Sequence, residues 1–155
     1  MTAQYGFASP LGILTVHEKD GTICALEFGG ETGGEKTPLI AQAVEQLTQY
    51  LEGKRRTFEL PFSPEGTAFQ KQVWDALCLI PYGETRCYQQ IAQMIGRLKA
   101  VRAVGMANHN NPLPIFIPCH RVIGKNGALV GYGGGLPIKA ALLKLEKEGT
   151  STWTR

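Results

Sequence analysis

Hydrophobic and polar residues alternate along the first 30 positions of the chain, which is the period of a half-buried β-strand. The hydrophobic residues on this period are Leu14, Val16, Cys24, Leu26 and Phe28. Asp20-Gly21 lies between the two runs and is a residue pair favoured in two-residue hairpin turns. We therefore predict antiparallel strands in a hairpin, followed by a polar, glycine-rich loop over residues 29–35.

A helical period replaces the alternation after this loop. Thr37 and Pro38 are residue types preferred at the N-cap and at the first helical position. The apolar residues that then share one helix face are Leu39, Ala43, Val44, Leu47 and Leu51. The pattern predicts a helix that begins after Thr37, stops at Gly53 and packs on the sheet. Residues 56–60 are interpreted as one further strand.

Pro61, Pro64 and Gly66 predict a linker after these elements, and we place a domain boundary near residue 63. The expected fold class is α/β (α+β). It combines an N-terminal domain of antiparallel sheet plus helix, residues 1–63, with a mostly helical C-terminal domain, residues 64–155.

Three helical segments are predicted in the C-terminal domain. The first begins at Thr67, and its apolar stripe consists of Phe69, Val73, Trp74, Leu77 and Ile80. The second covers residues 88–95, and its inward-facing residues are Ile91, Met94 and Ile95. Gly96-Arg97 separates it from a third helix over residues 99–108. Two short helices around such a turn match the helix-turn-helix signature, which also occurs in proteins that bind no DNA.

The third helix has two interpretations. Four of its residues have little or no side chain: Ala100, Ala103, Gly105 and Ala107. Small residues allow close packing against another helix. They also allow a helix to lie deep in a DNA groove, with Arg102 reaching forward.

Composition is that of an ordinary globular chain, with 43% hydrophobic residues among 155. No apolar run approaches the ~20 residues that span a bilayer, and the first residues do not resemble a signal peptide. The four cysteines lack CxxC spacing, so neither a disulfide framework nor a zinc knuckle is indicated. We expect a soluble, cytoplasmic protein with reduced thiols.

Charge is distributed unevenly along the chain. Residues 1–65 hold 5 Lys/Arg and 9 Asp/Glu, whereas residues 66–155 hold 11 and 4. A basic region gains free energy by releasing counterions from phosphates, which favours a polyanionic partner. The alternative, to which we give equal weight, is that the basic region is a surface in contact with solvent only.

One cysteine has a distinctive setting. Cys119 and His120 are adjacent between two apolar runs, in the stretch PIFIPCHRVIG. A catalytic thiol needs a neighbouring base or cation, but adjacent side chains usually diverge. Taken alone, Cys119 is interpreted as a buried, inert cysteine at the end of a strand, because that is the usual setting of a free cysteine.

The residues around Cys119 resemble the active-site signature of the O6-alkylguanine-DNA alkyltransferase family. The motif is Pro118-Cys119-His120-Arg121-Val122, preceded by Asn111-Pro112 and followed by Gly131-Tyr132 and Gly134-Gly135. The resemblance continues in order through Phe69, Val73-Trp74, Ile80-Pro81-Tyr82-Gly83, Tyr88, Arg102-Ala103-Val104-Gly105 and Leu142-Leu143 with Glu146. It covers roughly residues 60–149.

The resemblance implies a mechanism of direct damage reversal, in which the protein is consumed. Cys119, poised as an anion, would take the alkyl group from O6 of guanine, or from O4 of thymine. His120 would accept the thiol proton through a water molecule, and Glu146 would hold the imidazole in the needed tautomer. Asn111 would fix the turn, and Tyr88 would donate a proton toward guanine N3.

The same resemblance implies the partner and its binding residues. The partner is double-stranded DNA containing O6-alkylguanine, bound through the minor groove by a monomer that can cluster on DNA. Arg102 would fill the gap left by the flipped nucleotide. The other residues expected to contact DNA are Lys99, Ala103 and Arg121. The residues expected to line the base pocket are Val122, Tyr132 and Gly133, and carbonyls of Cys119 and Val122 would accept from the guanine amine.

Two departures from the family pattern are visible. Gly133 stands where some relatives place a serine, so the pocket would have more room for larger alkyl groups. Some relatives carry a structural zinc, but the N-terminal part offers only Cys24 and His17 as metal ligands. We therefore expect no metal and no cofactor.

Three other function classes are weighed against this one. A non-catalytic module that recognises alkylated DNA would lack the motif cysteine, which is present as Cys119. A cofactor-dependent enzyme is excluded, because too few residues follow the loop at 131–135 to build a dinucleotide-binding unit. A cysteine hydrolase uses similar residue types, but it would leave the basic C-terminal part without a role.

Overall fold

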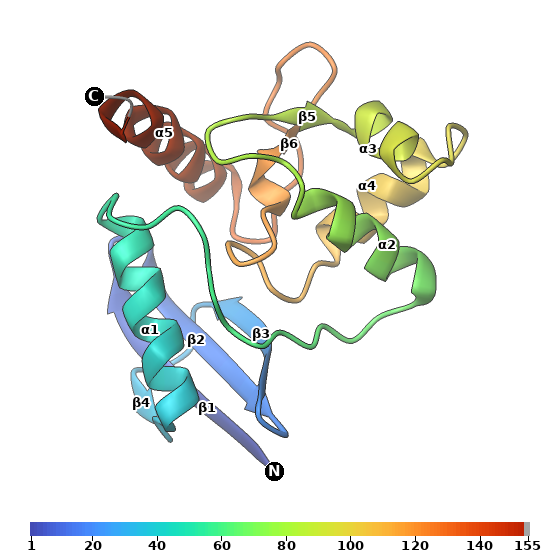
Figure 1. Cartoon of the computed structure of the whole chain (residues 1–155). Coiled ribbons are helices and arrows are strands. Elements are labelled where there is room, and N and C mark those ends of the chain that lie inside the picture. Colours follow the sequence, from blue (N-terminus) through green and yellow to red (C-terminus); the bar gives the residue numbers. More distant parts are fainter. Residues whose placement is uncertain (154–155) are drawn as a thin grey trace. The chain divides into compact units, whose positions relative to one another are not determined.

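The computed structural model describes the backbone of residues 1–153 and the side chains of residues 1–149. The chain divides into two compact units, the first from Met1 to Glu65 and the second from Gly66 onward (Figure 1). Each unit has its own core. In the described part of the chain, no helix combines the length and apolarity needed to cross a membrane.

The first unit is an antiparallel sheet with one helix. Its strands are β1 (Thr2–Ser9), β2 (Gly12–Lys19), β3 (Thr22–Phe28) and β4 (Gly33–Gly34), and they lie in the order β3-β2-β1-β4. The predicted hairpin is confirmed as β2 and β3, and the turn between them is formed by Asp20 and Gly21, both with positive φ. β1 is an additional strand that pairs with β2 along its whole length.

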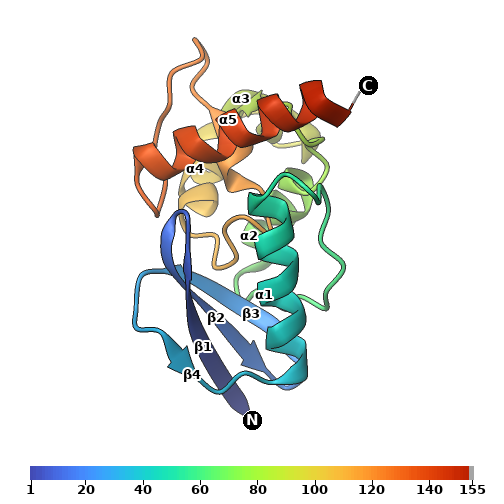
Figure 2. The same cartoon turned by 90° about the vertical axis from the view of Figure 1, so that its left-hand side faces the viewer.

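Helix α1 (Pro38–Leu51) covers one face of this sheet (Figure 2). It begins as predicted, because the Thr37 side chain accepts a hydrogen bond from the Ile40 backbone N–H at 3.1 Å. The core of the unit forms where the apolar face of α1 meets the inward side of the strands. Its fully buried residues include Leu14, Val16, Ile40, Ala43, Leu47 and Tyr50.

Two local predictions in this unit are wrong. Residues 29–35 are not loop throughout, because Gly33–Gly34 forms β4 and pairs with β1. Residues 56–60 form no strand in the structure. The side-chain amide of Gln46 on α1 bonds both backbone groups of Glu59, at 2.9 and 3.3 Å, and so takes the place of a neighbouring strand.

The second unit is mostly helical, as expected. Its elements are α2 (Ala68–Leu77), β5 (Arg86–Cys87), α3 (Tyr88–Met94), α4 (Val101–His109), the 3₁₀ turn η1 (Cys119–Arg121), β6 (Val122–Ile123) and α5 (Leu136–Trp153). The strands β5 and β6 are parallel and bring the start of α3 beside the end of η1. Helix α5 is not among the predicted elements.

The packing of α2, α3 and α4 follows from their apolar stripes. Thr67 caps α2 in a capping box with Gln70, and the buried Trp74 donates from Nε1 to the Ala107 carbonyl of α4 at 2.9 Å. Two details differ from prediction. Met94 is 43% exposed instead of facing inward, and α4 begins at Val101, so Lys99 precedes the helix.

Candidate active site

The position of Cys119 is set by the proline-rich segment before it. Each of Pro112, Pro114 and Pro118 restricts the residue that precedes it to extended conformations, so the chain can reverse only around Ile115 and Phe116. Ile115 takes this turn with φ 73°, a conformation that is costly for a β-branched residue. The reversal lets the Ile117 N–H reach the Leu113 carbonyl at 2.8 Å.

Asn111 holds this turn closed from both sides. Its Oδ1 accepts from the Leu113 N–H at 3.0 Å, and its Nδ2 donates to the Ile117 carbonyl at 2.9 Å. The Asn111 side chain also faces the thiol of Cys119, whose pKa it lowers. The side chain predicted to fix the turn therefore lies next to both the turn and the sulfur.

The turn η1 separates the two adjacent side chains of Cys119 and His120. Successive side chains of a 3₁₀ turn point about 120° apart, because three residues complete one turn. His120 is directed into the interior, where its Nε2 lies 2.7 Å from Glu146 Oε2 on α5. Cys119, which precedes His120 on η1, is itself buried at 4% exposure.

Glu146 receives four donors. Besides His120 Nε2, its oxygens accept from Arg121 Nε at 2.8 Å, from Arg121 Nη2 at 2.9 Å and from the Gly83 N–H at 3.2 Å. Arg121 also donates from Nη1 to the Ile80 carbonyl at 2.7 Å. The expectation that Arg121 contacts DNA is therefore corrected: the residue is 7% exposed, and its guanidinium is bonded to groups of the interior.

Burial dominates the electrostatics of the sulfur. Removal from water raises the pKa of Cys119 to about 11, although the hydrogen bond from Asn111 and the charge of Lys139 both oppose the rise. The side chain of Cys119 is therefore a neutral thiol at pH 7. Its proton must leave during the reaction.

The neighbouring pair has the protonation states that a base needs. Burial lowers the pKa of His120, and the hydrogen bond and charge of Glu146 only partly oppose this, so the imidazole is neutral at pH 7. Burial would raise the pKa of Glu146, but the hydrogen bonds from His120 and Arg121 outweigh it and hold that pKa far below its ordinary value. An ionised carboxylate accepts from Nε2–H, which leaves Nδ1 as the basic nitrogen.

Two buried residues that the sequence reasoning missed hold the carbonyls of this site. Lys139 of α5 is fully buried, and its Nζ donates to the carbonyls of Val122 at 2.5 Å and Val130 at 2.7 Å. Asn108 of α4 donates to the Cys119 carbonyl at 3.4 Å. The signal for Lys139 was its spacing, because Lys139 and Glu146 are seven positions apart on one helix face.

The residues predicted to line the base pocket differ in their relation to the Cys119 sulfur. Tyr88, at the start of α3, and the buried Tyr132 both interact electrostatically with Cys119, and burial raises the pKa of each phenol. Val122 is fully buried, directly after η1. Gly133 is exposed, and a Cβ built on it would have no neighbour within 4 Å.

The residues predicted to contact DNA, Arg121 apart, are exposed. Arg102 and Ala103 lie on α4 and Lys99 lies just before it. Among the small residues of α4, Ala103 is exposed, as binding in a DNA groove requires. Ala107 is instead buried against α2, where its carbonyl accepts from Trp74, as close helix packing requires. Two exposed hydrophobic residues, Val101 at 37% and Met106 at 59%, belong to the same helix.

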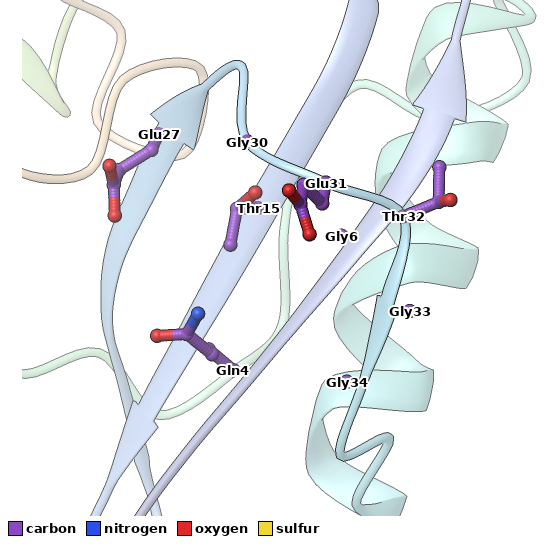
Figure 3. A pocket seen from close by; sticks show the side chains of 9 residues that line it. All are labelled: Gln4, Gly6, Thr15, Glu27, Gly30, Glu31, Thr32, Gly33 and Gly34. Carbon is purple, nitrogen blue, oxygen red and sulfur yellow. The ribbon is translucent and has the colours of Figure 1, made fainter.

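A separate hollow lies in the first unit, beneath the segment that leads to β4 (Figure 3). Its volume is about 380 Å³, and Glu27, Glu31, Gln4 and Thr15 supply its polar groups. None of the described cysteine, serine or histidine residues lines it. Among residues 1–153, no three His, Cys, Asp or Glu side chains are grouped as metal ligands would be.

Two protein-family models match most of the chain. The model described as "6-O-methylguanine DNA methyltransferase, ribonuclease-like domain" matches residues 5–64. The model described as "6-O-methylguanine DNA methyltransferase, DNA binding domain" matches residues 68–148. The two matches together span the sheet unit and the unit that contains Cys119.

Individual proteins are similar over nearly the same length. The constitutive methylated-DNA–protein-cysteine methyltransferase of Bacillus subtilis is 50% identical over 151 residues, covering 90% of this chain and 92% of its own. The crystal structure of Mycobacterium tuberculosis O6-methylguanine methyltransferase matches with a TM-score of 0.86 at 44% identity, over 96% of this chain and 94% of that one. A structure of M. tuberculosis OGT in complex with DNA matches with a TM-score of 0.85 at 44% identity, over 94% and 93%.

Proposed function

The chain belongs to the 6-O-methylguanine DNA methyltransferase family, and from this premise we propose that it repairs DNA by moving an alkyl group from O6 of guanine to its own Cys119. One observation carries the assignment of the acceptor: Cys119 lies beside a His120–Glu146 pair that is withdrawn from solvent. A thiol next to an oriented imidazole is an arrangement for nucleophilic attack.

The transfer is a single displacement at carbon. The Cys119 sulfur bonds to the alkyl carbon as the bond from that carbon to guanine O6 breaks. The thiol proton passes to His120 Nδ1 through a water molecule, and the imidazolium that forms is stabilised by Glu146. The leaving guanine takes a proton from the Tyr88 hydroxyl at N3. The product is a thioether, which none of these groups can cleave, so each protein molecule acts once.

The raised pKa of Cys119 gives the site selectivity. A neutral thiol reacts slowly with other electrophiles, because the thiolate is the nucleophile. The Cys119 thiol loses its proton when an alkylated guanine is held in the pocket with its alkyl carbon facing the sulfur. The Val122 carbonyl accepts one bond within the protein, from Lys139 Nζ, and keeps a second lone pair for the guanine amine, whereas the Cys119 carbonyl already accepts from Asn108 Nδ2 and from the Val122 N–H.

DNA would be bound by the exposed face of α4. A base inside a duplex cannot reach a buried sulfur, so the damaged nucleotide must be turned out of the helix. We propose that Lys99, Arg102 and Ala103 lie along the minor groove, that Arg102 fills the space left in the stack, and that the protein binds as a monomer. Contacts of this kind go mainly to phosphates and depend little on sequence.

Transfer of label tests the proposal. The protein is incubated with duplex DNA that contains O6-[³H-methyl]guanine, and label on protein is counted against protein added. We expect one equivalent at most, located on Cys119 by mass spectrometry, and none for Cys119→Ser, which still binds the DNA. Repeated turnover would favour a hydrolase, and binding without transfer by the wild type would favour a recognition module.

The recognition module is the weaker alternative. A protein that only marks alkylated bases has no need for a thiol at position 119, nor for a neutral imidazole oriented by a buried carboxylate. Both are present in this chain.

A further inference from the structure

Arg121 does not fit the role expected for a basic residue of a DNA-binding protein. It follows Cys119 and His120 on η1, yet its side chain turns inward and is 9% exposed. Its Nε and Nη2 bind the two oxygens of Glu146, and its Nη1 binds the Ile80 carbonyl. All three of its nitrogens are therefore used inside the second unit.

We propose that Arg121 is a positioning residue for alkyl transfer, which clamps the Glu146 carboxylate against His120 by binding both carboxylate oxygens, and that it does not bind DNA. The inference rests on the proposed function of Cys119. It goes further because it adds a member to the group that prepares the base.

Geometry explains why an arginine is needed for this clamp. Without Arg121, Glu146 would keep His120 Nε2 and the longer bond from the Gly83 N–H at 3.2 Å as partners, and it is carried by α5, an element separate from η1. The planar fork of a guanidinium fixes the carboxylate plane through two parallel bonds, which an ammonium cannot do. With Oε1 and Oε2 both engaged, Oε2 stays 2.7 Å from His120 Nε2.

The clamp also sets how strongly His120 binds a proton. A guanidinium that shares the carboxylate takes part of the negative charge that would otherwise favour the imidazolium. Arg121 therefore makes His120 a weaker base than an unshared Glu146 would. The imidazole stays neutral and ready to accept the thiol proton, even in mildly acidic solution.

Other charged or ionisable groups face His120 or the residues in contact with it. They are Cys119 and Arg121 on η1, Glu146 and Lys139 on α5, Tyr132 near Cys119 and Glu146, and Tyr82 and Cys78 beside Arg121. Lys139 is the other cation close to His120, and it has the same sign of effect as Arg121. Of these two cations, Arg121 is the one that binds the carboxylate in contact with the imidazole.

The test is the pH dependence of alkyl transfer from a substrate that has no DNA. Rates of Cys119 alkylation by free O6-benzylguanine are measured from pH 5 to 9 for the wild type, Arg121→Met and Arg121→Lys. Removal of the positive charge raises the pKa of His120, so in Arg121→Met the acid limb should move to higher pH by about one unit. Arg121→Lys keeps the charge but not the fork, and it should lower the rate with less movement of the limb.

Lys144→Met serves as the control. It removes the same charge from an exposed position on α5, where Lys144 pairs only loosely with Glu148 at 3.9 Å. Its profile should match that of the wild type. A profile of Arg121→Met with unchanged midpoint would overturn the inference, as would a variant that reacts normally with the free base but has lost affinity for DNA.

A measurement on the wild type covers the case in which these variants do not fold. The ¹⁵Nε–H signal of Arg121 should exchange slowly with solvent, with and without bound DNA, because the group is buried against Glu146. Rapid exchange in the free protein, or a crosslink from position 121 to DNA, would contradict the inference. Failure of the wild type to transfer any alkyl group would instead refute the proposed function.

Discussion

Glu146 Oε2 lies 2.7 Å from His120 Nε2, in a place where the two side chains are 1% and 0% exposed to solvent. The two residues come from different elements, α5 and η1, and are 26 positions apart in the chain. Because neither group can exchange its partner for water, the pair fixes the tautomer of the imidazole. The same enclosure makes Glu146 important for stability.

Glu146→Gln should lower the free energy of unfolding by roughly 3 kcal/mol, because Arg121 would be left buried without a counter-charge. Urea unfolding at pH 7 measures this loss. Glu148→Gln is the matched control, since Glu148 is 66% exposed and should change stability by less than ~0.5 kcal/mol. Equal effects of the two substitutions would show that the buried ion pair adds nothing.

The free energy of unfolding should also depend on pH through the ionisation of Glu146. Its pKa is held below the ordinary value by His120 and Arg121, against the opposing effect of burial. A carboxylate with a depressed pKa in the folded state stabilises the protein above its unfolded pKa of about 4.3, and this contribution is lost as pH falls toward the folded value. Unfolding free energies between about pH 5 and pH 3 should therefore fall less steeply in Glu146→Gln than in the wild type. Parallel curves would exclude this assignment.

The elements that could be predicted are those with local signals. The start of α1 is encoded by Thr37 and Pro38, and the turn between β2 and β3 by Asp20-Gly21. The short strand β4 could not be predicted, because two glycines carry no strand signal and their pairing depends on β1. Residues 56–60 have a strand pattern but form no strand, because the side chain of Gln46, distant in sequence, bonds the backbone of Glu59.

The residues of the active site also fall into those with a local sequence signal and those without one. The motif around Cys119 identified the sulfur, the imidazole and, through the family resemblance, Glu146. The direction of Arg121 was not predictable, because it depends on a partner 25 positions away on a helix that the sequence pattern did not indicate. Lysine is rarely buried, so the residue type of Lys139 predicts an exposed position. The spacing of Lys139 from Glu146 on one helix face is the signal that indicates its burial.

Arg102→Ala should slow repair of O6-methylguanine in duplex DNA by tenfold or more, corresponding to about 1.4 kcal/mol, because an unfilled gap in the stack makes flipping less favourable. Reaction with free O6-benzylguanine needs no flipping and should be affected much less. Single-turnover rates with both substrates measure the difference. Lys71→Ala, which removes an exposed charge from α2, is the control for net charge. If Arg102→Ala slowed both reactions equally, Arg102 would not act on DNA.

Gly133→Ser should fold normally and change only the preference for alkyl size. The added side chain meets nothing within 4 Å, and the backbone at this position has no left-handed φ to disfavour it. We expect the ratio of methyl to benzyl transfer rates to be smaller in the wild type than in Gly133→Ser, because the glycine leaves space for the larger group. Gly133→Ala separates the effect of volume from that of the hydroxyl. Identical ratios in all three proteins would remove Gly133 from the pocket.

Gly149→Ala should destabilise the protein, although alanine is ordinarily favoured over glycine within a helix by about 1 kcal/mol. Gly149 is buried in α5, and a Cβ there would overlap the hydroxyl oxygen of Tyr82 and lie 3.2 Å from its Cζ. Tyr82 in turn lies with its ring 5.8 Å from the Arg121 guanidinium, so a shift of the ring would also change its contact with Arg121.

The overlap should cost about 1–3 kcal/mol, which exceeds the gain in helix propensity. A double-mutant cycle with Tyr82→Phe measures it by urea unfolding. Because phenylalanine lacks the overlapping oxygen, Gly149→Ala should cost less in the Tyr82→Phe background than in the wild type. The cycle then reports a contact between α5 and the turn at residues 81–83. An unchanged cost would mean that the alanine is opposed by some other group, and stabilisation by Gly149→Ala would show that Tyr82 yields freely.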